Sequence, residues 1–282
     1  MRRGADLPMP GWRSRGFTLV EMIIAIVITG ILVGIVGMFG RRQIDAYIDV
    51  GNRAELADAA DTALRRIGRD LQSALPNSVR VDASGRFLEY VPIRDAGRYQ
   101  ADFGGDAKDD PLDFGSSTDA SFRVFGPPLS IRTGDQLVIF NLGQPGSDVY
   151  AGTSRRSIVG YATDVLTFAP AGTQFPLASP QNRFQIVGGP VSYECNIAQG
   201  TLIRHWCYDF QATQPVAFGG LVKHAACTAE QSAVLVSDVA GCSFNYSTAV
   251  SQRNGLVVVR LSLSRGGEAV ELLHQIEVLN TP

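Results

Sequence analysis

The apolar positions divide the chain into a helical N-terminal part and a strand-like remainder. Residues 22–39 form an apolar run of 18 residues without a charge, just long enough for a transmembrane helix. Helical periodicity continues beyond it on one apolar face, at Leu56, Ala60, Leu64, Ile67, Leu71 and Leu75. No proline interrupts residues 17–75, so we expect one continuous helix that ends before Pro76. Its opposite face is charged, with Asp58, Asp61, Arg65, Arg66, Arg69 and Asp70.

The remainder of the chain reads as strands and turns. Short β-rich runs alternate with Gly, Pro and Asp turns, at 87–91, 136–140, 183–187, 191–195, 202–207, 256–263 and 270–278. Arg265, Gly266 and Gly267 predict a hairpin between the last two runs. Residues 95–120 and 208–232 are expected to be irregular. The fold class predicted is α+β, a long N-terminal helix packed on a mainly antiparallel β-sheet head.

Composition excludes several functions. Charged residues make up 18% of the chain and the net charge is −2, so no basic field is available to hold nucleic acid. No GxSxG, Walker A, GxGxxG or HExxH motif occurs, so we expect no catalytic residue, no cofactor and no metal. His205, His224 and His274 lie far apart in the sequence. An acidic cluster offers oxygen ligands for calcium without EF-hand spacing, and we interpret it as a solvated loop: Asp102, Asp106, Asp109, Asp110 and Asp113.

The N-terminus departs from an ordinary secretory signal. A secretory signal places its small-residue cleavage site after the apolar stretch, whereas Gly16 comes before it. Cleavage at Gly16 would remove the basic leader and leave the apolar segment on the mature chain. An uncleaved signal anchor is the alternative. Glu21 lies just inside the start of the longer segment 16–39, which is otherwise uncharged, and a charge in a membrane costs at least about 2.5–3.5 kcal/mol, so Glu21 needs a partner.

The string Gly16-Phe17-Thr18-Leu19-Val20-Glu21 resembles the processing site of type IV prepilins. The resemblance implies cleavage between Gly16 and Phe17 by a membrane prepilin peptidase, which then methylates the new amine of Phe17. It also implies that Glu21 pairs with the charged N-terminus of a neighbouring subunit. The alternative for Glu21 is that its side chain extends to the lipid headgroups. Gly30 and Gly34 form a GxxxG pair, which allows membrane helices to approach closely.

The prepilin resemblance also predicts the organisation of the chain. Residues 1–16 would be a cleaved leader, 17–39 a transmembrane or filament-core helix, 40–76 the amphipathic half of that helix, and 77–282 a β-rich head. The chain would cross the inner membrane once with its head in the periplasm, and could enter a surface pilus.

Four cysteines in the last third predict two disulfides in an oxidising compartment. A hairpin that turns near Gly200 places Cys195 opposite about Leu202, and leaves Cys207 roughly 16 Å further along. This separation disfavours a Cys195–Cys207 bond. We favour Cys195–Cys242 with Cys207–Cys227 nested inside it, and the crossed pairing remains open.

Further stretches are similar to minor pilins of mannose-sensitive haemagglutinin (MSHA) pilus biogenesis, the MshO type among PilW/GspJ-like minor pilins. They are residues 60–66, 74–80, 110–114 and 255–268. This resemblance implies a structural subunit that primes or assembles an MSHA-type pilus. Its partners would be the prepilin peptidase/methyltransferase, other major and minor pilins and the inner-membrane assembly platform. The alternatives are a minor pseudopilin of a type II secretion system and an adhesive head displayed on the pilus.

Overall fold

The structure is a computed structural model that describes residues 16–169, 174–251 and 254–282. The chain divides into two compact units, residues 1–51 and 52–282, which are described separately. One helix, α1 (Leu19–Gln72), begins in the first unit and continues into the second. The leader predicted over residues 1–15 lies outside the described residues.

In the described part of the first unit, the apolar segment of α1 is exposed. Within the described residues, Leu19–Phe39 is the one segment long and apolar enough to cross a membrane, and none of it is buried inside the chain. Ile23, Ile28 and Ile31 are each more than half exposed. Removing such an apolar surface from contact with water is strongly favourable. We therefore expect lipid or another protein to cover it.

The helix ends at Gln72, three residues before the predicted Leu75. The backbone N–H of Leu75 donates to the carbonyl of Val91 at 2.8 Å, and that of Ile93 donates to Ser73 at 2.8 Å. The Ser73 hydroxyl donates to the carbonyl of Asp70 at 2.8 Å. The chain therefore leaves the helix early because its last residues exchange helical hydrogen bonds for contacts with the segment after β2 (Phe87–Tyr90).

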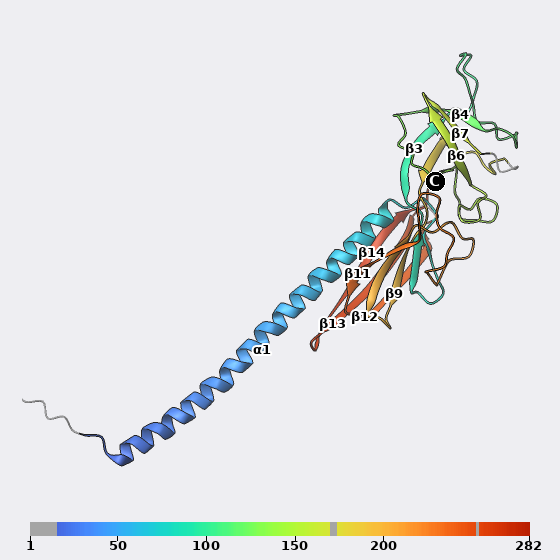
Figure 1. The fold of residues 1–282 in the computed structure, drawn as a ribbon. Coiled ribbons are helices and arrows are strands. Elements are labelled where there is room, and N and C mark those ends of the chain that lie inside the picture. The colour runs from blue at the N-terminus through green and yellow to red at the C-terminus, as the bar shows by residue number, and fades with distance from the viewer. Residues whose placement is uncertain (1–15, 170–173, 252–253) are drawn as a thin grey trace, which may run out of the picture. The chain divides into compact units, whose positions relative to one another are not determined.

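Two antiparallel sheets accompany the helix in the second unit, which we call the head (Figure 1). The first has the order β1-β2-β9-β10-β11, with β1 (Arg80–Val81), β2 (Phe87–Tyr90), β9 (Val191–Asn196), β10 (Thr201–Trp206) and β11 (Gln231–Ser237). The second has the order β12-β13-β14, with β12 (Val239–Ser251), β13 (Asn254–Arg265) and β14 (Glu268–Leu279). The α+β class and the antiparallel head predicted from the sequence are confirmed.

The largest core lies between the helix and these sheets. The predicted apolar face of the helix is buried from Leu56 to Leu71, and Ala60 and Ile67 have no exposed surface. Inward-facing side chains of both sheets complete the core, among them Leu88, Tyr193, Leu202, Val257 and Leu261. The hairpin predicted at Gly266 and Gly267 is present, and both glycines have positive φ, 61° and 91°, a conformation that glycine adopts without strain.

The remaining strands form a closed barrel, which the sequence patterns did not predict. Its order is β3-β4-β7-β6-β5-β8, with β3 (Ile93–Tyr99), β4 (Ser121–Phe125), β5 (Gln136–Val138), β6 (Arg155–Ala162), β7 (Val165–Phe168) and β8 (Arg183–Val187). Phe122, Leu166 and Phe184 fill its interior without exposed surface. Of the two stretches expected to be irregular, the first begins with the end of β3 and the second ends with the start of β11.

The barrel is inserted between two strands that pair directly with each other. Strands β2 and β9 are antiparallel neighbours with Tyr90 opposite Val191, so residues 91–190 leave and re-enter the sheet at one point. A third apolar cluster joins the barrel to the end of the helix, through Leu75, Val91, Val138, Val149, Tyr150, Val187 and Phe210.

Candidate functional site

The helix α1 begins directly after Thr18. The backbone N–H of Glu21 donates to Thr18 Oγ1 at 3.3 Å, and that of Met22 donates to the Thr18 carbonyl at 3.2 Å. Thr18 is therefore the N-cap of α1, and Glu21 lies in its first turn. The capping role of Thr18 was not predicted from the sequence, although a threonine followed three residues later by glutamate is a recognisable capping signal.

Gly16 and Phe17 precede the helix and are exposed. A Cβ atom placed on Gly16 would meet no atom of the chain within 4 Å, so nothing in the chain's own packing requires glycine there. Phe17 is 82% exposed. The bond between them therefore lies in an exposed segment outside the helix, where a protease can approach the backbone.

The glycines of the apolar helix also lie in open space. Added Cβ atoms on Gly30, Gly34 and Gly37 would meet nothing within 4 Å. Glycine costs about 1 kcal/mol relative to alanine in a helix, so retaining three of them on an unpacked surface is unfavourable for the isolated chain. The surface they leave suits close contact with another helix.

A comparison with protein-family models finds a match at this N-terminal segment. The model of the prokaryotic N-terminal methylation motif matches residues 13–37, which include Gly16, Phe17 and Glu21. This motif is typical of type IV prepilin-like proteins. No curated protein and no solved structure matches the chain.

The prepilin-like motif explains why α1 begins with an exposed apolar segment. In prepilins such a helix is the membrane anchor, and Leu19–Phe39 suggests one anchor here. The motif and the β-sheet head together suggest a structural subunit of the pilin or pseudopilin kind. The motif implies processing by a prepilin peptidase and assembly with other pilins.

Asp70 connects the end of the helix to the five-stranded sheet. Its carboxylate accepts hydrogen bonds from the hydroxyls of Tyr90 at 2.9 Å and Tyr193 at 2.7 Å. Arg204 and Arg66 each approach it at 3.1 Å. The sequence analysis placed Asp70 on the charged face of the helix without this role. Helical periodicity cannot show which side chains of a distant sheet contact that face.

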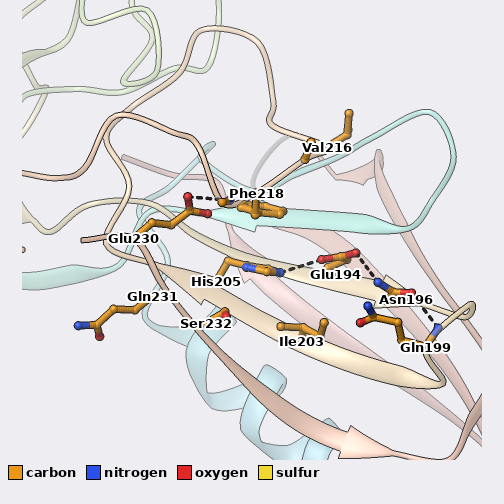
Figure 2. A pocket seen from close by; sticks show the side chains of 12 residues that line it. Glu194, Asn196, Gln199, Ile203, His205, Val216, Phe218, Glu230, Gln231 and Ser232 are labelled. Atoms are coloured by element: carbon orange, nitrogen blue, oxygen red, sulfur yellow. Dashed lines mark hydrogen bonds and ion pairs between the residues drawn. The ribbon is translucent and has the colours of Figure 1, made fainter.

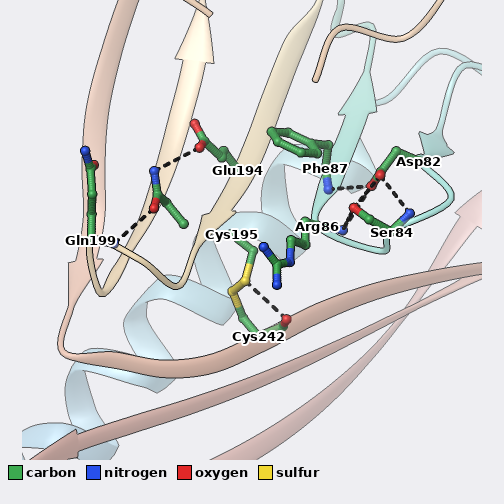
Figure 3. The surroundings of a disulfide bond; sticks show 9 residues. Asp82, Ser84, Arg86, Phe87, Glu194, Cys195, Gln199 and Cys242 are labelled. Carbon is green, nitrogen blue, oxygen red and sulfur yellow. Dashed lines mark hydrogen bonds between the residues drawn. A yellow bond between two sulfur atoms is a disulfide. The ribbon is translucent and has the colours of Figure 1, made fainter. Parts of the chain in front are cut away.

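Two disulfides brace the head. Cys195 in β9 is bonded to Cys242 in β12, with Cα atoms 5.9 Å apart, and so links the two sheets (Figure 3). Cys207 is bonded to Cys227, with Cα atoms 5.7 Å apart, and closes the loop between β10 and β11. These are the pairs favoured from the sequence, and Cys195 lies opposite Leu202 as the hairpin argument required.

The loop between Cys207 and Cys227 covers a buried acid. Glu89 has no exposed side chain and pairs with Arg80 at 2.6 Å, while the Tyr208 hydroxyl donates to it at 2.8 Å. Burial raises the pKa of the Glu89 carboxyl, against the opposing effects of Arg80 and Tyr208. Arg80 also donates to the carbonyls of Gln211 and Ala212 at 2.8 Å each, which fixes the first half of the loop on the sheet.

The acidic cluster forms its own turn. The carboxylate of Asp109 accepts hydrogen bonds from the Gln100 amide at 2.6 Å and from the backbone N–H groups of Gly104 and Asp106 at 2.7 and 2.9 Å. Among the described residues, no group of three or more His, Cys, Asp or Glu side chains is arranged to hold a metal ion.

Proposed function

We propose that the chain is a minor pilin-like subunit that takes part in assembling or priming an MSHA-type pilus. The observation that carries the proposal is the prokaryotic N-terminal methylation motif at the start of a fully exposed apolar helix. The MshO-type resemblance of the head stretches supports the choice of pilus. The head would then lie in the periplasm before assembly.

In this proposal the peptidase cleaves between Gly16 and Phe17 and methylates Phe17. Gly16 suits the enzyme because it presents no side chain, and the chain itself does not need glycine there. Glu21 of the inserted subunit pairs with the Phe17 amine of a neighbour. Two opposite charges at low dielectric compensate each other's burial, while either charge alone is penalised.

The N-terminus of the membrane-purified protein tests the processing step. Cells that contain the peptidase should yield a chain that begins at N-methylated Phe17, read by mass spectrometry, and peptidase-deficient cells should yield the full leader. A Gly16→Leu variant should keep its leader in both strains. An unprocessed wild-type chain in the presence of the peptidase would refute the prepilin function.

A minor pseudopilin of a type II secretion system is the second candidate, since the same N-terminal motif serves both kinds of assembly. Deletion of the gene separates the two. Loss of pili with normal secretion supports the first function, and loss of secretion with normal pili supports the second. An adhesive head is a further alternative, which binding of the purified chain to a host or abiotic surface would support.

A further inference from the structure

The face of the five-stranded sheet that points away from the helix carries a pocket that the proposed function leaves unused. It encloses about 520 Å³ (Figure 2). Its floor comes from side chains of β9, β10 and β11 that alternate with the core residues of the same strands. Its roof comes from the loop between Cys207 and Cys227. The lining residues that matter below are Glu194, His205, Phe218, Glu230, Gln231 and Ser232.

The roof of the pocket is held in place. The ring of Phe218 stacks on that of His205, with centroids 3.8 Å apart and planes 5° from parallel. Glu230 accepts hydrogen bonds from the backbone N–H groups of Gly219 at 2.8 Å and Leu221 at 3.4 Å. The Cys207–Cys227 bond closes the base of the loop. The pocket is therefore preformed, which lowers the entropy lost when a ligand binds.

The charges around the pocket favour a cation. Two carboxylates line it, Glu194 and Glu230, and none of its described lining residues is Lys or Arg. Glu194 Oε2 lies 2.8 Å from His205 Nε2, whereas Glu230 Oε1 is buried and accepts no hydrogen bond from a described residue. An aromatic ring beside carboxylates is the combination that binds guanidinium and ammonium groups, through cation–π contact and charge-assisted hydrogen bonds.

The pocket borders a free sheet edge. Strand β11 is the last strand of its sheet, and Gln231, Ser232, Ala233 and Val234 are all exposed. Its seven residues include no charge and no proline, the residues that usually prevent edge pairing. A bulge at Leu235 confines the regular edge to residues 231–234. An added strand would send alternate side chains toward the face on which the pocket lies.

We propose that the β11 edge and this pocket together bind an extended segment of a partner protein, with an arginine or lysine side chain of that segment in the pocket. Backbone pairing along residues 231–234 supplies alignment, and Glu230 and Glu194 select the positive charge. The site belongs to the head alone, so it stands or falls separately from leader cleavage and helix packing.

Three synthetic peptides test the proposal on the full chain, purified in a polyoxyethylene detergent that carries neither charge nor sugar. The first alternates Thr and Val around a central Arg, the second replaces Arg by neutral citrulline, and the third keeps Arg but has alternate backbone nitrogens methylated. Fluorescence anisotropy should show the Arg peptide binding about tenfold more tightly than either control. No binding, equal binding of the citrulline peptide, or equal binding of the methylated peptide would each overturn the proposal.

Matched variants locate the site. Glu230→Gln and Glu194→Gln keep side-chain shape and should each remove the preference for Arg over citrulline. Glu268→Gln, at the first residue of β14 and outside the pocket lining, is the control and should leave that preference unchanged. Circular dichroism checks that each variant is folded. An intact Arg preference in both pocket variants would contradict the assignment of the cation to this pocket.

Discussion

Asp70 is the residue that most directly couples the helix to the head. It is half-buried and holds two tyrosine hydroxyls and two arginines at once. Burial by itself would raise the pKa of the Asp70 carboxyl. The hydrogen bonds from Tyr193 and Tyr90 and the charges of Arg204 and Arg66 outweigh burial and hold that pKa below its ordinary value. The ionised carboxylate therefore stabilises the folded head.

Replacing Asp70 by Asn should lower the free energy of unfolding by about 2 kcal/mol at pH 7, because an amide cannot satisfy both arginines. The folded pKa lies below the unfolded value of about 3.9, so the unfolded chain takes up the proton first. The stabilisation is thus complete above about pH 5 and is lost as the pH falls. Urea unfolding should show the difference between wild type and Asp70→Asn shrinking between pH 5 and 3.

Asp61→Asn is the control for this prediction. Asp61 pairs with Arg65 on the exposed face of the same helix, at 2.7 Å, and its side chain is 44% exposed. An exposed ion pair of this kind contributes about 0–1 kcal/mol. Equal losses in the two variants would mean that the tyrosine and Arg204 contacts of Asp70 add no stability.

Glu21 leads to a prediction about assembly rather than folding. Glu21→Ala should leave cleavage after Gly16 intact and reduce incorporation into filaments several-fold, because the amine of the neighbouring subunit loses its counter-charge. Immunoblots of sheared pili against membranes measure the incorporated fraction. Asp58→Ala, an exposed acid further along the helix, should incorporate normally. Normal incorporation of Glu21→Ala would remove the pairing role and favour the headgroup alternative.

Local signals at the residue scale were readable from the sequence where neighbours along the chain decide the structure. The Gly16–Glu21 string, the helix face and the Cys195–Leu202 register all depend on residues close in sequence. The roles of Asp70 and Glu230 depend on partners more than a hundred residues away or on a folded loop. No periodicity encodes such contacts, so the pocket and the helix–sheet network could not be predicted.

The two disulfides constrain different elements, and removing them should have different results. Cys195–Cys242 closes a separation of 47 residues and links two sheets, while Cys207–Cys227 closes 20 residues and holds one loop. In the loop-entropy view they contribute about 4 and 3 kcal/mol. The variant in which Cys195 and Cys242 are both alanine should unfold in one transition, at a lower urea concentration than the wild-type chain.

The double-alanine variant of the second disulfide should release mainly the loop over the pocket. Hydrogen exchange of its amides should rise at residues 208–226 while the strands of both sheets keep their protection. Uniform loss of protection across the head would show that the loop and the sheets unfold as one cooperative unit. Global protection unchanged in both variants would contradict the stabilising role of the disulfides.

The sequence patterns predicted many of the elements, among them the barrel strands β5 and β8, but not the closure of the barrel. The long helix and the β9, β10, β13 and β14 regions follow from periodicity and turn residues. Strands β4 and β7 alternate between buried and partly buried positions but are only five and four residues long, and β6 alternates weakly, so none of the three was predicted. Barrel closure joins β3 to β8 across some ninety residues of sequence, a pairing that no local pattern encodes, although the cost of closing a loop grows only slowly with its length.

On the scale of the head, the barrel is an insertion into a complete sheet. Its two ends meet where Tyr90 pairs with Val191, and it has an aromatic core of its own. Inserted modules whose ends lie close together can often be removed without loss of the host fold. The apolar cluster that contains Leu75 and Phe210 is where the barrel packs against the segment after the helix and the loop between Cys207 and Cys227.

Replacing residues 91–190 by Asn-Gly should therefore leave a folded head. Asn-Gly favours the two-residue turn that would join Tyr90 to Val191 as a hairpin. The shortened chain should still form the Cys195–Cys242 bond, mapped by mass spectrometry, and unfold cooperatively. Its stability should fall by several kcal/mol, because Leu75 and Phe210 lose their buried neighbours.

Changing Leu75 and Phe210 to Ser in the shortened chain should improve its solubility. A shortened chain without that disulfide and without a cooperative transition would mean that the barrel is required for the sheets to form.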